Sequence, residues 1–474
     1  MTDWTTDLAV IGAGPAGLAA AMAAAEAGVD VTVLDAEAEP GGQIYKAVDV
    51  SPLADVQALG ADYSEGVALV SAFRKTGIRH VGATEVWTVT PDGEIGLIRD
   101  GRTSFLQAAR IVIACGAQER PFPFEGWTLP GVMTAGAGQV LLKSAGVVPS
   151  RGVVLAGLGP LVLLVAWQYV RLGVGVRAVL DMTPRANFVR AAPFMPAAVT
   201  AGDYIAKGLR MQRELKRAGV PIHGRVTGIR AVGTDRVAGV EFVTGGQTRL
   251  IETSLLLAHF GLVPETSLSR ALGIPHKWDG SQQCWRPRAD DWGRTNLPRV
   301  QIAGDGRGIF GAKSAMWSGR LAGLEAARTL DRLTELERDE KAVSIRAKQR
   351  RDHRIRPFLE ALYALPDRAW RQIPNEVTVC RCEEVTAGNV RAAVTAGAIG
   401  CNQVKVFSRA GMGPCQGRQC GGTIARIVAD VTGRPIDDVQ LPRSRFPLRP
   451  IELGALADME LPAPLLDQAD TCPE

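Results

Sequence analysis

Four cysteines near the carboxyl end of the chain have the type and spacing to hold a metal centre. Cys380 and Cys382 form a C-x-C pair, and Cys415 and Cys420 follow as C-x4-C. Four thiolates from so short a stretch can bind a metal centre through sulfur alone, each cysteine being deprotonated by the metal that it binds. Structural zinc usually takes C-x2-C or longer pairs, so this spacing favours an iron–sulfur centre over zinc.

A second chemical motif lies near the amino end, in the sequence DLAVIGAGPAGLAAAMAAAEAGVDVTVLD. An apolar strand, a glycine-rich turn, an alanine-rich helix and a second strand are expected there. The first glycine allows the tight turn, the second lets the backbone approach a pyrophosphate, and the third lets the helix lie against the strand. An acidic residue ends the second strand, where it can bind a ribose. The dinucleotide contacts expected are Gly12, Gly14, Pro15, Ala16, Gly17 and Asp35.

Three later segments resemble the flavin contacts of flavoproteins with two dinucleotide-binding domains. They are the loop after the second strand, the A-x-G-A turn that follows an apolar strand, and a late Gly-Asp pair. Because they occur in the expected order, they favour FAD over NAD at the amino-terminal site. The residues that carry this resemblance are Gly42, Gln43, Ala114, Gly116, Gly304 and Asp305.

Residues 151–181 repeat the first pattern imperfectly. Gly157 and Gly159 match the first two glycines, but the third position holds Val162, and Asp181 ends the next strand. A nucleotide-binding fold is expected here. Whether the site holds NAD(P), holds an adenine nucleotide or stays empty is left open. His259 lies at the end of this region and is expected to be a packed core residue rather than a catalyst.

Composition and charge indicate an ordinary soluble chain of two or three domains. It has 474 residues, 46% of them apolar and 22% charged, with a net charge of +5, which is too small an excess to indicate nucleic acid binding. Residues 152–170 are long enough to span a membrane, but their GLGP segment indicates a buried strand, a turn and a helix. The chain shows no signal peptide and no disulfide framework, so a cytoplasmic location is expected. No ligand role is expected for Cys115, Cys284, Cys401 or Cys472.

The expected fold class is α/β, with two Rossmann-like domains, one inserted in the other, and a small helical module at the carboxyl end. Residues 317–351 are expected to form a continuous charged helix that begins a connector. The predicted boundaries are 1–135 and 290–330 for the FAD-binding domain, 136–289 for the second nucleotide-binding-like domain, 331–373 for the helical connector, 374–440 for the cluster module and 441–474 for an extended tail.

The motifs CRCEEVT and GMGPCQGRQC resemble the 2Fe–2S module of bacterioferritin-associated ferredoxins, which implies that the four cysteines bind such a cluster. The whole order of parts resembles the large subunit of heteromeric opine oxidases and D-hydroxyproline dehydrogenases, to which a hydrogen cyanide synthase subunit is related. This resemblance implies that a secondary amine is oxidised in a separate flavin-bearing β subunit. It also implies a small third subunit, FMN at a subunit interface, and transfer of electrons through this chain to an external acceptor.

Two other functions are compatible with the same motifs. One is a self-contained NAD(P)H-dependent reductase, which the second glycine loop would serve. The other is a non-catalytic iron–sulfur carrier, indicated by the cysteine module alone. No set of acid, base or nucleophilic residues suggests catalysis by this chain, and without a C-x2-C pair the disulfide chemistry of thioredoxin reductase relatives is excluded.

Overall fold

The computed structural model describes residues 4–457 and 459, apart from residue 54. The amino-terminal segment forms a parallel β–α–β unit, in which β1 and β2 pair with Leu8 opposite Val31. The helix between them begins at Pro15, whose fixed φ suits the first turn and whose missing N–H needs no partner there. The three elements are β1 (Trp4–Ile11), α1 (Pro15–Ala25) and β2 (Val31–Leu34).

The first sheet has seven strands in the order β3-β2-β1-β6-β5-β4, with β19 also paired to β6. Because β19 pairs in parallel with β6, the chain returns to this sheet after building the second one. The remaining strands are β3 (Arg79–Val81), β4 (Glu85–Val89), β5 (Glu94–Arg99), β6 (Arg102–Ile113) and β19 (Val300–Ile302).

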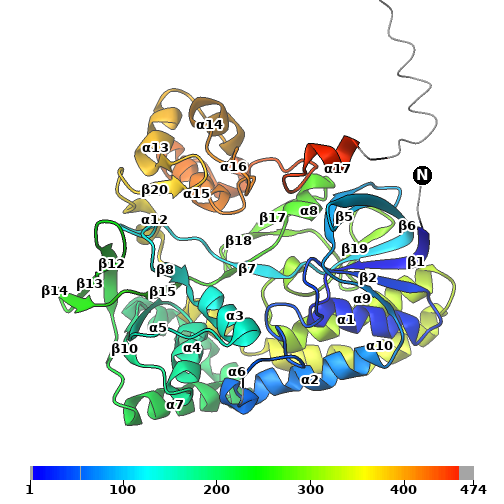
Figure 1. The fold of residues 1–474 in the computed structure, drawn as a ribbon, viewed down its shortest axis with the longest axis horizontal. Coiled ribbons are helices and arrows are strands. Elements are labelled where there is room, and N and C mark those ends of the chain that lie inside the picture. Colours follow the sequence, from blue (N-terminus) through cyan, green and yellow to red (C-terminus); the bar gives the residue numbers. More distant parts are fainter. Residues whose placement is uncertain (1–3, 54, 458, 460–474) are drawn as a thin grey trace, which may run out of the picture.

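The second sheet has five strands in the order β11-β10-β9-β15-β8, and its neighbouring strands pair in parallel. Its strands are β8 (Val132–Thr134), β9 (Val153–Gly157), β10 (Val176–Asp181), β11 (Ile222–His223) and β15 (Leu256–His259). The helices α3 (Ala135–Ala145), α4 (Pro160–Arg171) and α7 (Gly202–Arg217) belong to the same part of the chain (Figure 1). An antiparallel sheet extends from it, formed by β12 (Val226–Val232), β13 (Gly239–Thr244) and β14 (Gln247–Glu252).

Residues 152–170 form the buried strand β9, a turn and helix α4, as the GLGP segment predicts. No helix within the described residues is long and apolar enough to cross a membrane. The predicted class of fold, with two Rossmann-like sheets, is confirmed.

The predicted continuous helix over residues 317–351 is wrong, because the chain forms two helices there. They are α9 (Ala312–Thr329) and α10 (Glu335–His353). Asp331 turns the chain with a φ of 57°, and Thr334 then caps α10 in a capping box with Glu337. The signal T-E-L-E is present in the sequence, and it is the start pattern of a helix. Helix α9 lies against α1, where a Cβ at Gly319 would come within 2.0 Å of the Ala16 carbonyl oxygen.

The carboxyl-terminal unit is a small group of helices that lies over the second sheet (Figure 1). Its apolar side chains share one buried cluster with those of that sheet, and the indole N–H of Trp127 donates to the Thr378 carbonyl at 2.7 Å. The tail then packs back on the first sheet, where Leu448 N donates to the Trp87 carbonyl at 3.2 Å. The elements are β20 (Thr378–Cys380), β21 (Val385–Thr386), α13 (Ala387–Thr395), α14 (Cys401–Ser408), α15 (Gly421–Thr432), α16 (Ile436–Val439) and α17 (Leu453–Ala457). Cys472 and the end of the predicted tail lie outside the described residues.

Candidate functional site

The four predicted cysteines come together in the carboxyl-terminal unit. Cys380 lies within interaction range of Cys420, and Cys382 within interaction range of Cys415. The two pairs also lie close enough for Cys380 to interact electrostatically with Cys382, and Cys415 with Cys420. Cys380 and Cys420 are buried, whereas Cys382 is exposed. The group therefore has two sulfurs in the core and one facing solvent.

The backbone around these cysteines favours negative charge on sulfur. Gly411 N donates to Cys380 Sγ at 3.4 Å. The Cys420 thiol, together with the N–H groups of Gly411, Glu383 and Cys382, outweighs burial and lowers the pKa of Cys380 to about 5. A Cβ at Gly413 would lie 2.2 Å from Cys382 Cβ, so a glycine is required there. These thiols and N–H groups are suited to an iron–sulfur centre.

Among the described residues, no group of three or more His, Cys, Asp or Glu side chains forms a site for a single metal ion. The cysteines are instead arranged as two neighbouring pairs. A 2Fe–2S centre takes four cysteines, two for each iron.

The fold of the first glycine-rich turn requires glycine at two positions, Gly12 and Gly17. At the third, Gly14, the absence of a side chain leaves space for a ligand. Gly12 has a φ of 109°, and a Cβ at Gly17 would lie 1.8 Å from the Gly12 carbonyl oxygen. At Gly14 the nearest atom to an added Cβ is 3.8 Å away. Gly14 thus leaves open space at the amino end of α1, where helix N–H groups favour a phosphate. The Asp35 carboxylate accepts from Ala13 N in the same turn and from Glu37 N at 2.7 Å.

The other predicted flavin contacts surround this turn. Gly42 lies directly against it, since a Cβ there would come within 2.8 Å of Gly14 Cα, and Gly41 N donates to the Ala13 carbonyl at 2.8 Å. The turn at Ala114 and Gly116 closes over Gly12, whose added Cβ would meet the Ala114 carbonyl oxygen at 2.5 Å.

A buried lysine, which the motifs did not indicate, holds the Gly41–Gln43 loop. Lys143 on α3 is 2% exposed. Its ammonium group donates to the carbonyl oxygens of Gln43 at 3.3 Å and Ile44 at 2.9 Å, and to Gln139 Oε1 at 3.0 Å. Lys143 therefore positions the loop that carries Gln43. The only sequence signal was the i, i+4 spacing of Gln139 and Lys143 on one helix.

We expect Lys143→Met to lower the free energy of unfolding by about 1–3 kcal/mol at neutral pH, because the buried Gln139 amide oxygen and two partly buried carbonyl oxygens lose their donor. Burial lowers the pKa of Lys143 to about 7, below its value in the unfolded chain. The unfolded chain thus binds more protons above pH 7, and Lys143 makes stability rise with pH there. Urea denaturation at pH 7 and at alkaline pH should show this rise in the wild type and not in the variant.

The matched control is Lys313→Met, which removes a half-exposed lysine paired with Glu65 at 3.1 Å. It is expected to leave stability and its pH dependence nearly unchanged. Equal effects of the two substitutions would contradict the positioning role of Lys143.

The second glycine turn has a histidine–glutamate pair beside it. His259 Nδ1 lies 2.6 Å from Glu119 Oε1, and Glu119 Oε2 accepts from Gly136 N at 2.8 Å. A Cβ at Gly157 would lie 1.8 Å from the His259 carbonyl oxygen, and one at Gly159 would lie 3.9 Å from the imidazole. His259 is buried, and it borders the backbone that would approach a pyrophosphate. Asp181 Oδ1 accepts from Thr183 N at 2.9 Å at the end of β10.

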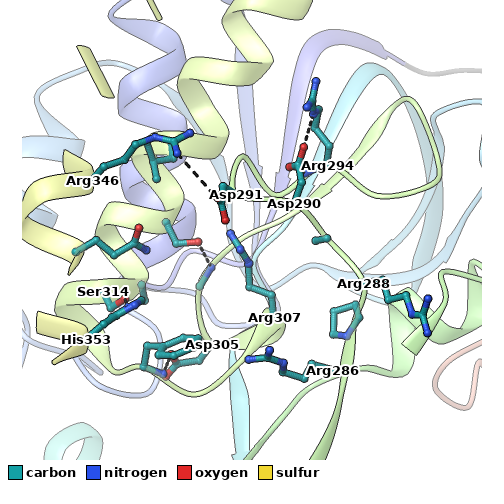
Figure 2. Close-up of a pocket in the computed structure, with 18 of the residues that line it drawn as sticks. Arg286, Arg288, Asp290, Asp291, Arg294, Asp305, Arg307, Ser314, Arg346 and His353 are labelled. Carbon is teal, nitrogen blue, oxygen red and sulfur yellow. Dashed lines mark hydrogen bonds and ion pairs between the residues drawn. The ribbon is translucent and has the colours of Figure 1, made fainter. Parts of the chain in front are cut away.

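A charged cavity of about 980 Å³ lies between α9, α10 and residues 286–294 (Figure 2). Gly304 and Asp305 line it, and the Asp305 carboxylate accepts from the N–H groups of Phe310 at 2.9 Å and Gly311 at 3.0 Å. The cationic side chains that line it are Lys277, Arg286, Arg288, Arg294, Arg307, Arg346 and Arg350, against the acids Asp290, Asp291 and Asp305. This excess of positive charge is suited to a phosphate-bearing ligand.

His353 is placed at this cavity by contacts that the sequence did not indicate. Its ring stacks on Phe310, with centroids 4.5 Å apart, and its Nε2 lies 2.7 Å from Ser314 Oγ. The residues come from α10, α9 and the loop before α9, so no local pattern joins them.

Two Rossmann-like sheets, a dinucleotide turn on the first and a helical unit after them define a flavoprotein oxidoreductase fold. Comparison with known proteins narrows this class. Residues 6–329 match the pyridine nucleotide-disulphide oxidoreductase family, and residues 376–459 match the sarcosine oxidase A3 domain. The chain belongs to the pyridine nucleotide-disulphide oxidoreductase family, and within it to the relatives of opine oxidase.

The chain is 39% identical to an opine oxidase subunit from Agrobacterium tumefaciens (strain Ach5) over 462 residues, which cover 96% of this chain and 92% of that protein. It is 31% identical to hydrogen cyanide synthase subunit HcnB of Pseudomonas aeruginosa, covering 95% of this chain and 98% of that protein. A crystal structure of L-proline dehydrogenase from P. horikoshii has the same fold, with a TM-score of 0.71 at 19% identity, covering 96% of this chain and 80% of that one.

Proposed function

We propose that this chain is the electron-transfer subunit of a heteromeric flavin and iron–sulfur dehydrogenase that oxidises a secondary amine, such as an opine or D-hydroxyproline. The observation that carries the proposal is the paired four-cysteine group in a chain that also has a dinucleotide turn and matches an opine oxidase subunit over 96% of its length. The amine is oxidised in a flavin-bearing β subunit, and a small third subunit completes the complex. The compartment is the cytoplasm.

FAD is assigned to the first sheet. The pyrophosphate is bound at the open face of Gly14, and the loop held by Lys143 orients Gln43 toward the flavin. Asp35 lies at the end of β2, where it binds the ribose. FAD takes up two electrons together and can release them singly, whereas a 2Fe–2S centre takes one at a time. The chain thus couples a two-electron reaction to one-electron steps.

The four cysteines are assigned to the 2Fe–2S cluster. Gly411 N and the neighbouring N–H groups stabilise charge on the buried Cys380 sulfur. Cys382 and the nearby Met412 are exposed, and Arg409 pairs with Glu383 at 2.9 Å beside them. This exposed edge is where we expect electrons to pass to a partner or an external acceptor.

The charged cavity of Figure 2 is lined by Gly304 and Asp305, which are two of the predicted FAD contacts, so it is assigned to FAD; FMN is proposed at an interface with the β subunit. Arg307 is buried enough that its pKa is lowered, and the excess of cations around it is suited to a phosphate group. At the second sheet, Gly157, Gly159 and Asp181 remain candidates for a second nucleotide, NAD(P) or an adenine nucleotide. The imidazole of His259 faces any ligand bound there.

The test is anaerobic reduction of the complex purified with its partner subunits. Opines and D-hydroxyproline are added one at a time, and flavin absorbance is followed. Bleaching by one of these amines, followed by the spectrum of a reduced iron–sulfur centre, is the expected result. Bleaching by NADH and by no amine would establish the self-contained reductase instead. A chain that purifies without flavin, iron or partners would overturn the proposal.

Gly14→Ala is expected to leave folding intact while lowering FAD affinity at least about tenfold, because the added methyl blocks the approach of the pyrophosphate. The structure has room for the Cβ, with its nearest neighbour at 3.8 Å, and the φ of Gly14 is −76°. Flavin content and melting temperature measured on the same preparation separate the two effects. The control is Gly208→Ala on α7, where nothing lies within 4 Å of the added Cβ; it should keep its flavin.

A further inference from the structure

A small cavity lies at the junction between the carboxyl-terminal unit and the rest of the chain. It has a volume of about 80 Å³ and is lined from both sides. Arg120 and Arg270 belong to the body, whereas Arg418 and Arg426 belong to the carboxyl-terminal unit. Residues of β7 (Ala117–Glu119), β16 (Leu262–Pro264), α8 (Ser267–Ala271), β17 (His276–Asp279), β18 (Cys284–Pro287) and α12 (Asp367–Arg371) line it. We call it the junction cavity.

Positive charge in the junction cavity is poorly compensated by the protein. Burial lowers the pKa of Arg270 and of Arg426 to about 10 each, and lowers that of Arg120. The acidic residue on the lining is Glu265, whose Oε1 accepts from Ser267 N at 2.8 Å. Arg426 also pairs with Asp367, at 3.5 Å. Buried cations are normally paired. Arg120 and Arg270 form no ion pair with the residues that the structure describes, so they lack the negative charge that buried arginines require.

Residues that line the cavity also carry buried hydrogen-bond donors without acceptors. Within the described part of the chain, Arg120 Nε, Arg426 Nη2, and the indole nitrogens of Trp285 and Trp370 have no hydrogen-bond partner. Both indole rings are 6% exposed. All four atoms donate and none accepts. A buried donor without a partner destabilises the folded state, so a ligand rich in acceptors would be favoured.

Contacts with the surrounding protein fix the positions of two of these arginines, Arg426 and Arg120. Arg426 lies between Trp278 and Trp370, with its guanidinium carbon 5.0 and 4.7 Å from the two ring centroids. Arg120 Nη2 donates to the Gln282 carbonyl at 2.7 Å. Across the junction, Gln118 Nε2 donates to the Arg418 carbonyl at 3.1 Å. The cationic group is therefore preorganised.

We propose that the junction cavity binds a small oxyanion, a carboxylate or a phosphate, that bridges the carboxyl-terminal unit and the body. Guanidinium groups pair with both anions through two parallel hydrogen bonds. The volume of 80 Å³ can hold several water-sized groups, which suits a small oxyanion and is too small for a nucleotide. The bound anion joins Arg120 and Arg270 to Arg426 and so fastens the unit that carries the four cysteines. The proposal does not depend on the assigned redox function.

The test is thermal unfolding of the full chain with millimolar inorganic phosphate or acetate, compared with chloride at equal ionic strength. An anion that binds the folded state raises the melting temperature in a saturable way. A larger rise with phosphate than with acetate identifies a phosphate site, and the reverse identifies a carboxylate site. If neither phosphate nor acetate raises the melting temperature above its value in chloride, the proposal is overturned and the arginines contact only water.

Arg270→Gln separates ligand binding from a structural role. The Arg270 guanidinium makes no hydrogen bond or ion pair with any residue that the structure describes. Removing it should therefore keep or raise the melting temperature in chloride and abolish the shift caused by the anion. A lower melting temperature with the anion-dependent shift intact would contradict the proposal.

A second variant distinguishes loss of anion binding from a folding defect caused by Arg270→Gln. Trp285→Phe removes one unpartnered N–H and part of a buried ring, so it should lower the melting temperature in chloride and weaken the anion-dependent shift measured from that lower value. The control is Arg213→Gln, which removes an exposed arginine of α7 and should retain the full shift. The proposal would be overturned if the two single variants, Trp285→Phe and Arg270→Gln, both kept the full anion-dependent shift in melting temperature.

Discussion

Cys380→Ala is expected to lower the iron content of the purified protein by more than about tenfold, since loss of outer contacts alone weakens metal sites by about 10–100-fold. Cys380 is 0% exposed at the end of β20. Its sulfur lies within interaction range of Cys420 and accepts the N–H of Gly411. Removing it leaves three thiols of the four-cysteine group and no partner for Cys420. Iron and acid-labile sulfide, measured against protein, test the result.

The matched control is Cys401→Ala in the same unit. Cys401 is also buried, at 3% exposure, and its thiol donates to the Gln440 carbonyl at 3.1 Å, away from the four-cysteine group. The Cys401→Ala variant should keep its iron. Equal iron loss in the two variants would indicate that the unit had merely unfolded. Zinc in place of iron in the wild type would remove the proposed electron transfer altogether.

The sequence could predict the first sheet and its turn because the requirement is local. Gly12 and Gly17 are fixed by contacts within the turn and with Ala114, and a larger residue at any of these contacts would collide with backbone. The strand, turn and helix of residues 152–170 were predictable for the same reason, since GLGP places the turn. Spacing alone also selected the four cysteines that the fold brings together.

Features that join distant residues could not be predicted in this way. His259 and Glu119 lie in separate strands, and Lys143 on α3 contacts the distant Gly41–Gln43 loop. The junction cavity needs arginines from both the body and the carboxyl-terminal unit. Their partners are decided by how the sheets and the unit pack, which no local pattern records. The break between α9 and α10 differs, because its capping signal at Thr334 is local and can be found in the sequence.

Glu325→Gln is expected to have the largest effect on stability, about 3–5 kcal/mol, because it removes the only buried carboxylate among the described partners of Arg338, which is itself buried. The other acidic partners of Arg338, which are Glu335 and Asp339, are exposed. Glu325 on α9 is 0% exposed. It accepts from Arg338 of α10 at 2.6 Å and from Arg328 at 2.7 Å, and Arg294 lies 3.6 Å away. Arg338 also stacks on Trp292 at 4.1 Å. The substitution thus loosens α10 from α9.

The effect should depend on pH. Burial alone would raise the pKa of Glu325, but hydrogen bonds from Arg328 and Arg338 outweigh it and hold the pKa below its ordinary value. The carboxylate therefore contributes its full stability above the unfolded pKa of about 4.3, and the contribution is lost as pH falls through the folded pKa. The difference between wild type and variant, followed by circular dichroism in urea, should be constant near neutral pH and shrink in acid. Glu26→Gln, which removes an exposed partner of Arg320 at 3.4 Å, should cost less than about 1 kcal/mol; a comparable loss there would show that the helices are not held by the buried carboxylate.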